Sequence, residues 1–144
     1  MPELTIYGLL DDLKETSEVK DGDVAVEVLE GADPVIQAVV RDCEEFPVFL
    51  NVAGEQILAI SYLWKTDEVT SEKRADLHEA LLRANLPIPL SSFSMIDDCY
   101  VIFGALSVSS STSEVVTEIL TLSDNTLEAI DAMQEYLNQQ KTDT

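Results

Sequence analysis

Apolar residues near the start of the chain recur with the period of a helix. Four of them share the i, i+3, i+4 and i+7 spacing of one helix face: Ile6, Leu9, Leu10 and Leu13. This spacing predicts a short helix over residues 3–16. Farther along, every second residue from Val24 to Val28 is valine, and residues 35–40 are mostly β-branched, so two strands are predicted there.

Residues 47–53 and 56–64 are rich in aliphatic and aromatic side chains and predict two more strands. Gly54 and Glu55 between them fit a type II′ hairpin turn, which requires glycine in its first position. The turn sets a register that pairs Val52 with Ile57 and Phe49 with Ile60. Both faces of this hairpin are then apolar, and we expect it in the middle of the sheet.

The following residues predict a helix over 67–84 and a second hairpin over 93–104. The turn of this hairpin, Asp97-Asp98, lacks the glycine of tight turns, so we expect a loop longer than two residues. The connection over residues 86–90, Leu-Pro-Ile-Pro-Leu, is apolar, and we expect it to pack against the body of the protein.

The last helix begins at a capping box, in which the Ser111 side chain accepts a backbone hydrogen bond and Glu114 returns one. We expect one helix to about residue 140, although Ser123-Asp124-Asn125 could break it, and a frayed tail over 141–144. Its apolar stripe consists of Ile119, Leu122, Thr126, Ala129, Met133 and Leu137.

The element order is helix, four strands, helix, two strands, helix. Strands that come in hairpins form a largely antiparallel sheet, and helices gathered on one face give an α+β domain of two layers. With 144 residues, 46% of them hydrophobic, the chain has the apolar mass for one core. We therefore expect a single domain over residues 1–144.

The formal net charge is −20, from 28 acidic and 8 basic side chains, and residues 84–140 contain no lysine or arginine. Such a charge is repelled by nucleic-acid phosphates and by anionic membrane surfaces, so neither is an expected partner. Two interpretations of the charge stay open. The acidic side chains serve solubility, including in a saline cytoplasm, or an acidic face docks on a basic protein.

The chain starts without the basic segment of a secretory signal, and none of its apolar runs approaches the roughly 18 residues of a membrane span. We therefore expect a cytoplasmic protein that does not insert into membranes.

Residue types that carry chemistry are few and scattered. The cysteines, Cys43 and Cys99, form no CxxC motif, and the one histidine, His78, is expected in a structural role on a helix. There is no nucleophile elbow, phosphate-binding loop or zinc or calcium motif. We therefore expect no catalytic residue, no metal and no cofactor. A small carboxylate-dependent enzyme would need two acidic side chains from different elements to meet in a pocket.

Three residues are candidates for contact with a protein partner. Trp64 ends a predicted strand and is either part of the core or, if exposed beside Lys65, a hot spot for a partner. Met133 and Leu137 belong to the stripe of the last helix, which is long enough to exceed what a small sheet can cover.

Residues 46–137 resemble the YjfI family, a bacterial family of unknown function. The likeness is carried by 49–58 (FLNVAGEQIL), 63–64 (LW), 67–69 (DEV), 86–91 (LPIPLS), 100–107 (YVIFGALS) and 122–125 (LSDN). It implies a cytoplasmic bacterial protein, often encoded beside a homologue of phage-shock protein A, and it transfers no catalytic residue. The element order is also similar to type III secretion chaperones and to YbjN-like domains, which are dimeric or bind partners.

These observations lead to three hypotheses. The first is a non-enzymatic protein-binding or regulatory module, expected to be a homodimer and linked to a phage-shock protein A-like partner. The second is a chaperone-like dimer that binds an extended peptide. The third is the small carboxylate-dependent enzyme.

Overall fold

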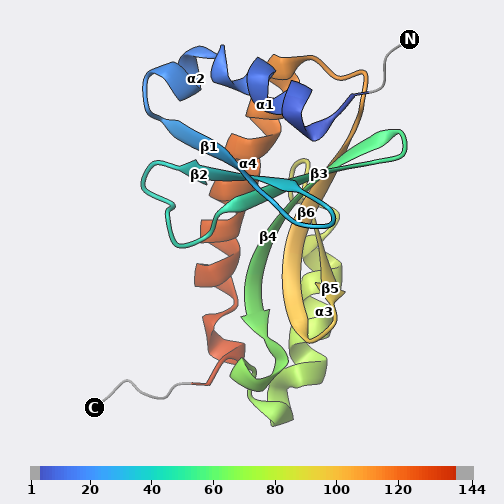
Figure 1. The fold of residues 1–144 in the computed structure, drawn as a ribbon. Coiled ribbons are helices and arrows are strands. Elements are labelled where there is room, and N and C mark those ends of the chain that lie inside the picture. Colours follow the sequence, from blue (N-terminus) through green and yellow to red (C-terminus); the bar gives the residue numbers. More distant parts are fainter. Residues whose placement is uncertain (1–3, 139–144) are drawn as a thin grey trace.

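The computed structural model describes residues 4–138. Its centre is one antiparallel sheet of six strands in the order β1-β2-β3-β4-β6-β5. The strands are β1 (Val24–Leu29), β2 (Val35–Val40), β3 (Val48–Ala53), β4 (Gln56–Lys65), β5 (Ser92–Ile96) and β6 (Cys99–Ser107). Figure 1 shows β1 and β2 in front of the long helix Thr112–Ala132, which lies behind the sheet.

Within residues 4–138, four α-helices accompany the sheet: α1 (Ile6–Lys14), α2 (Ser17–Lys20), α3 (Arg74–Ala84) and α4 (Thr112–Ala132). α1 packs on β1 and β2, α4 on the middle strands, and α3 on β5 at the other end. These helices lie on one face of the sheet. Successive side chains of a strand point to opposite faces, so every second strand residue faces the helices. The predicted α+β class, with two layers and a largely antiparallel sheet, is confirmed.

The hydrophobic core lies between that face of the sheet and the helices. It is built from inward-facing strand residues and from the apolar stripes of α1 and α4. The largest fully buried members include Leu13, Ile36, Leu50, Ile57, Tyr100, Ile102, Ile119 and Leu122. β4 and β6 both contribute residues to this core, and β6 pairs with the outer strand β5.

The central hairpin follows the sequence expectation. β3 and β4 pair with Val52 opposite Ile57 and Phe49 opposite Ile60, and they occupy the middle of the sheet. Gly54 has a φ of 62°, the left-handed value that the first position of a type II′ turn requires.

The second hairpin differs from its prediction. Ile96 pairs with Cys99, so the loop is only two residues long, and the expectation of a longer loop was wrong. Asp97 takes up the positive φ, at 53°. Aspartate tolerates this conformation better than most residues, so glycine is not needed.

The two longer predicted helices are shorter than expected. α3 begins at Arg74 rather than at residue 67, and two 3-10 turns precede it. α4 is continuous through residues 123–125, as expected, but it ends at Ala132 rather than near residue 140. Both differences have one cause, since Val69 and Leu137 form a β-bridge that holds both segments extended. The predicted tail over 141–144 lies outside the described residues.

The first helix also stops early. It ends at Lys14, and the side chain of Thr16 then caps the short helix α2 by accepting a hydrogen bond from the backbone N–H of Val19, at 3.4 Å. The helix predicted over residues 3–16 is therefore α1 alone, and α2 follows it as a short helix that was not predicted. At the start of α4, the predicted capping box of Ser111 and Glu114 is confirmed.

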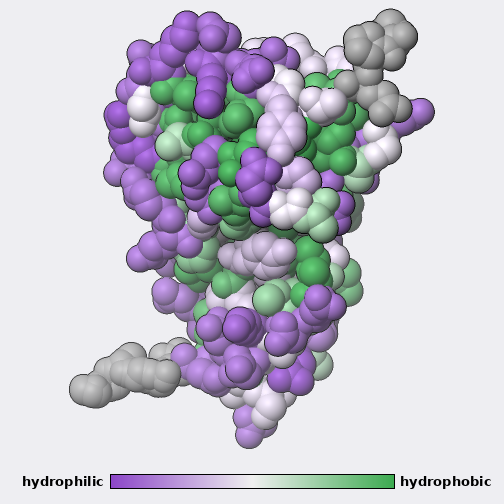
Figure 2. All heavy atoms as spheres, viewed as in Figure 1, coloured by the Kyte–Doolittle hydropathy of each residue, from purple (hydrophilic) through white to green (hydrophobic). Residues whose placement is uncertain are grey.

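The other face of the sheet carries no helix within the described part of the chain. Its central side chains are apolar or aromatic and half-buried, as at Phe49, Ile60 and Phe103. Tyr62 is 44% exposed and meets the Phe49 ring edge-on, with ring centroids 5.9 Å apart. Figure 2 shows hydrophobic residues gathered over the strands on the viewed side, bordered by hydrophilic ones. We call this surface the open sheet face.

Candidate protein-binding site between α3 and β5

Large apolar side chains are exposed mainly in one part of the described chain. Nine of them are classed as exposed within residues 4–138, and five of the nine belong to residues 82–96. The exposed fractions of these five are 71% for Leu82, 93% for Leu86, 60% for Leu90, 42% for Met95 and 36% for Ile96. Single exposed apolar residues are ordinary, but such a local concentration indicates a contact surface.

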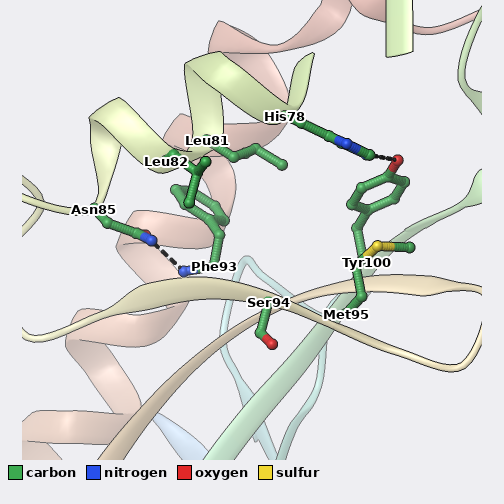
Figure 3. A pocket seen from close by; sticks show the side chains of 8 residues that line it. All are labelled: His78, Leu81, Leu82, Asn85, Phe93, Ser94, Met95 and Tyr100. Atoms are coloured by element: carbon green, nitrogen blue, oxygen red, sulfur yellow. Dashed lines mark hydrogen bonds between the residues drawn. The ribbon is translucent and has the colours of Figure 1, made fainter. Parts of the chain in front are cut away.

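A hollow of about 240 Å³ lies between α3 and β5 (Figure 3). It is lined by His78, Leu81, Leu82, Asn85, Phe93, Ser94, Met95 and Tyr100. The lining contains no lysine, arginine, aspartate or glutamate among the described residues. The site therefore suits an uncharged, apolar group.

Asn85 fixes one end of the hollow. It follows α3 as the C-cap residue, and its side-chain oxygen accepts a hydrogen bond of 2.8 Å from the backbone N–H of Phe93. Because this bond ties the end of α3 to β5, the two walls of the hollow keep a fixed spacing. Leu81 packs into the core behind them, at 6% exposure.

The other end of the hollow is formed by His78 and Tyr100. The ring Nε2 of His78 and the hydroxyl of Tyr100 are 2.7 Å apart and form a hydrogen bond (Figure 3). Tyr100 is fully buried and meets Trp64 edge-on, with ring centroids 6.1 Å apart. Burial raises the pKa of the Tyr100 hydroxyl, so it stays protonated at neutral pH. These contacts give His78 a structural partner, in line with its predicted role.

The candidate nucleophiles are poorly placed for catalysis. Burial raises the pKa of the Cys43 thiol, and the nearby carboxylates of Asp124, Glu44 and Glu45 raise it further. Burial is also the main reason why the pKa of the Cys99 thiol is raised. Thiols with a raised pKa are weak nucleophiles at neutral pH. No cluster of residues suited to hold a metal ion is found within residues 4–138.

One acidic side chain is buried away from this hollow. Glu118 on α4 is 4% exposed, and its Oε2 atom has no hydrogen-bond partner among the described residues. Its carboxyl group occupies the space where Gly104 has no side chain, beside the backbone oxygen of Leu90. Burial raises the pKa of Glu118. Burial is the one cause of this shift, and no other carboxylate of the described residues contributes to it.

The structure places the three predicted contact residues in or against the core. Trp64 is 6% exposed and packs on Tyr100, so the structure shows the first of its two alternatives, a place in the core. Met133 is 8% exposed, and Leu137 is half-buried in its bridge with Val69. Met133 and Leu137 lie beyond the end of α4 and not on a free helical stripe. A role in binding for these residues stays a prediction.

The residues of the hollow were missed from the sequence. Leu82, which lines the hollow, and Leu86, just beyond the end of α3, are four residues apart and off the buried stripe of Leu77 and Leu81. This second apolar direction could have identified the surface. The connection over residues 86–90 was expected to pack against the body. Ile88 does pack on the core, and the backbone oxygen of Pro89 accepts a hydrogen bond from Asn125, but the side chains of Leu86 and Leu90 are exposed.

A family model described as "Uncharacterized protein conserved in bacteria (DUF2170)" matches residues 3–137. The "Uncharacterized protein YjfI" of Escherichia coli (strain K12) is 38% identical over 100 residues, which cover 67% of this chain and 74% of that protein.

None of the described helices is long and apolar enough to cross a bilayer.

Solved structures share the fold at low sequence identity. An uncharacterized protein from Methanothermobacter thermautotrophicus superposes with a TM-score of 0.63 and 13% identity, covering 93% of this chain and all of the other. YbjN from E. coli gives a TM-score of 0.61 and 17% identity, covering 91% and 94% of the two chains. A weaker likeness, with a TM-score of 0.47 and 14% identity, is to the ExoU-SpcU complex of Pseudomonas aeruginosa, covering 79% and 84%.

Proposed function

Because the chain belongs to the DUF2170 family of uncharacterized bacterial proteins, we propose its function from its surface. We propose a non-enzymatic protein-binding module that holds its partner at the hollow between α3 and β5. The observation that carries this proposal is an uncharged hollow lined by the exposed Leu82 and Met95, in a stretch of sequence with three more exposed apolar side chains. Burying one leucine of this kind contributes about 1.5–3 kcal/mol, so a few such contacts offset a substantial part of the cost of association.

The charge of the chain defines the partner further. A net charge of −20 favours a basic or neutral protein over nucleic acid or an anionic membrane. The resemblance to the YjfI family adds a phage-shock protein A-like coiled coil as the first partner to test. It also supports a cytoplasmic location, which is part of this proposal.

The absence of enzymatic activity is likewise a proposal. The raised pKa values of the two thiols support it. Glu44 supports it as well, since the backbone N–H of Asp42 donates a hydrogen bond that lowers the pKa of the Glu44 carboxyl. A lowered pKa is the opposite of what a general acid at neutral pH needs.

Self-association is a second candidate, favoured by the open sheet face. Side chains at its centre are uncharged, including Phe49, Asn51, Ile60 and Tyr62, so two acidic copies could meet there with little local repulsion. Light scattering after gel filtration measures the mass directly. A monomer of 15.9 kDa at high protein concentration would exclude the dimer.

The binding site is tested with a variant in which Leu82→Gln and Leu86→Gln are combined. Leu127→Gln is the matched control, because Leu127 is 43% exposed on α4, outside the proposed site. Purified phage-shock protein A homologue and proteins cross-linked in the native host are captured on each variant. We expect the double variant to lose the partner and the control to keep it. Equal capture by all variants would refute the site.

A further inference from the structure

β5 forms the outer edge of the sheet beside β6. Ile96 and Cys99 close the two-residue loop, so they form a hydrogen-bonded pair. Such pairs alternate along an antiparallel ladder, and the backbone groups of Phe93 and Met95 therefore point away from β6, toward the open edge. The bond from the Phe93 N–H to the Asn85 side chain agrees with this direction.

Three backbone groups of this edge are consequently open to a partner: the N–H and C=O of Met95 and the C=O of Phe93. The fourth, the N–H of Phe93, is satisfied by Asn85. The side chains of Phe93 and Met95 line the hollow (Figure 3). An unpaired strand edge and an apolar side-chain pocket thus lie next to each other.

We propose that the partner contributes an extended segment, which pairs with β5 as a seventh strand and inserts one apolar side chain into the hollow. This inference rests on the proposed function and specifies how the same site binds. Strand addition obtains affinity from main-chain hydrogen bonds and specificity from side-chain pockets. The hollow of about 240 Å³ is smaller than the pockets of about 300–1,000 Å³ that take small-molecule ligands, and it suits a single side chain.

The charge identifies the segment as basic and as part of a different protein. The net charge of −20 attracts a basic segment over a distance, and it gives a second copy of this chain no such attraction. A second β5 would also be a poor match, because its Phe93 N–H is already bonded and Asp97, with a positive φ, ends the strand. A lysine- or arginine-rich segment is attracted to the acidic protein, while its apolar residue meets the uncharged hollow.

The probe is a nine-residue peptide with two lysines at each end and the centre Thr-Val-Leu-Val-Thr. Three further peptides carry methionine, phenylalanine or isoleucine in place of the central leucine, and a fourth carries aspartate. We expect saturable binding of at least one apolar peptide to the complete chain and none of the aspartate peptide. Hydrogen exchange at the Met95 amide should slow on binding. If none of the apolar peptides binds, the inference is wrong.

Met95→Pro tests the strand pairing, with Met95→Ala as the matched control. Both variants lose the methionine side chain, but only proline also removes the outward N–H. Proline is tolerated on an edge strand where the N–H faces outward, and the fluorescence of the buried Trp64 reports folding. We expect proline to weaken peptide binding a further two- to tenfold, roughly the net value of one hydrogen bond.

Equal affinity of the two variants would overturn strand pairing. If the proline variant does not fold, peptides that are N-methylated at alternate residues are used with the wild-type chain. N-methylation removes the hydrogen-bond donors of the peptide backbone, so an unchanged affinity of these peptides would overturn strand pairing. The proposed function is judged separately. It stands if the Leu82→Gln and Leu86→Gln variant still loses its protein partner, and it fails together with this inference if that variant retains it.

Discussion

Replacing Gly104 by alanine is expected to destabilise the protein because the space beside this glycine is filled. A methyl group at residue 104 would overlap the carboxyl group of Glu118 and would lie 2.9 Å from the backbone oxygen of Leu90. The side chain of Glu118 is buried and would have to leave its packed position, and a backbone oxygen moves only with its segment. Overpacking of this kind costs about 1–3 kcal/mol.

The magnitude can be assigned to Glu118 with a double-mutant cycle. In a Glu118→Ala background the carboxyl group is gone, and only the contact with the Leu90 oxygen remains. We expect Gly104→Ala to cost at least about 1 kcal/mol less there, since contacting residues couple by about 0.5–3 kcal/mol. Gly31→Ala is the matched control, because nothing lies within 4 Å of its new methyl group.

Urea denaturation, followed by the fluorescence of Trp64, measures the free energy of unfolding of each variant. We expect the control to be neutral or stabilised by up to about 1 kcal/mol, since alanine restricts the unfolded chain. If the two substitutions at 104 and 118 are additive to within about 0.5 kcal/mol, the carboxyl group does not occupy the space beside Gly104. The packing argument would then be refuted.

Two further predictions concern the same helix. Burial raises the pKa of Glu118 in the folded protein above its value in the unfolded chain. The contribution of this group to folding stability is therefore complete below the pKa of the unfolded chain, and it is lost as pH rises through the pKa of the folded protein. Glu118→Gln should therefore become more stable relative to wild type between pH 5 and pH 8 in urea titrations, and a pH-independent difference would contradict this reasoning. Ser111→Ala should cost about 1 kcal/mol by removing the N-cap of α4, measured by thermal unfolding against Ser110→Ala. An equal loss in both serine variants would speak against the cap.

Local patterns predicted those elements whose structure is decided locally. The bounds of β2 agree with the β-branched run over residues 35–40, and the glycine of the central turn gave the pairing of β3 with β4. The capping box at Ser111 likewise depends on residues three apart. In each case the interactions that form the element lie within a few residues of one another.

Long-range contacts account for the failures. Val69 has the spacing of a helical residue, yet Leu137, 68 residues later, draws it into a β-bridge, and both neighbouring helices are shortened. The binding site was missed for a related reason. Leu82 and Met95 come from separate elements, and the packing of α3 on β5, tied by the bond between Asn85 and Phe93, brings those elements together. Trp64 was ambiguous in the sequence because its exposure depends on Tyr100, 36 residues away.

The hydrogen bond of Asn85 to Phe93 also limits how the β5 edge of the sheet can pair with further copies of the chain. A bare strand edge is a template on which further copies can stack into fibres. Here the edge is five residues long. The Asn85 side chain takes the N–H of Phe93 near one end, and Asp97, with its positive φ, ends the strand at the other. This short edge can pair with one strand of a partner, but it is a poor template for stacking one copy of the chain on the next.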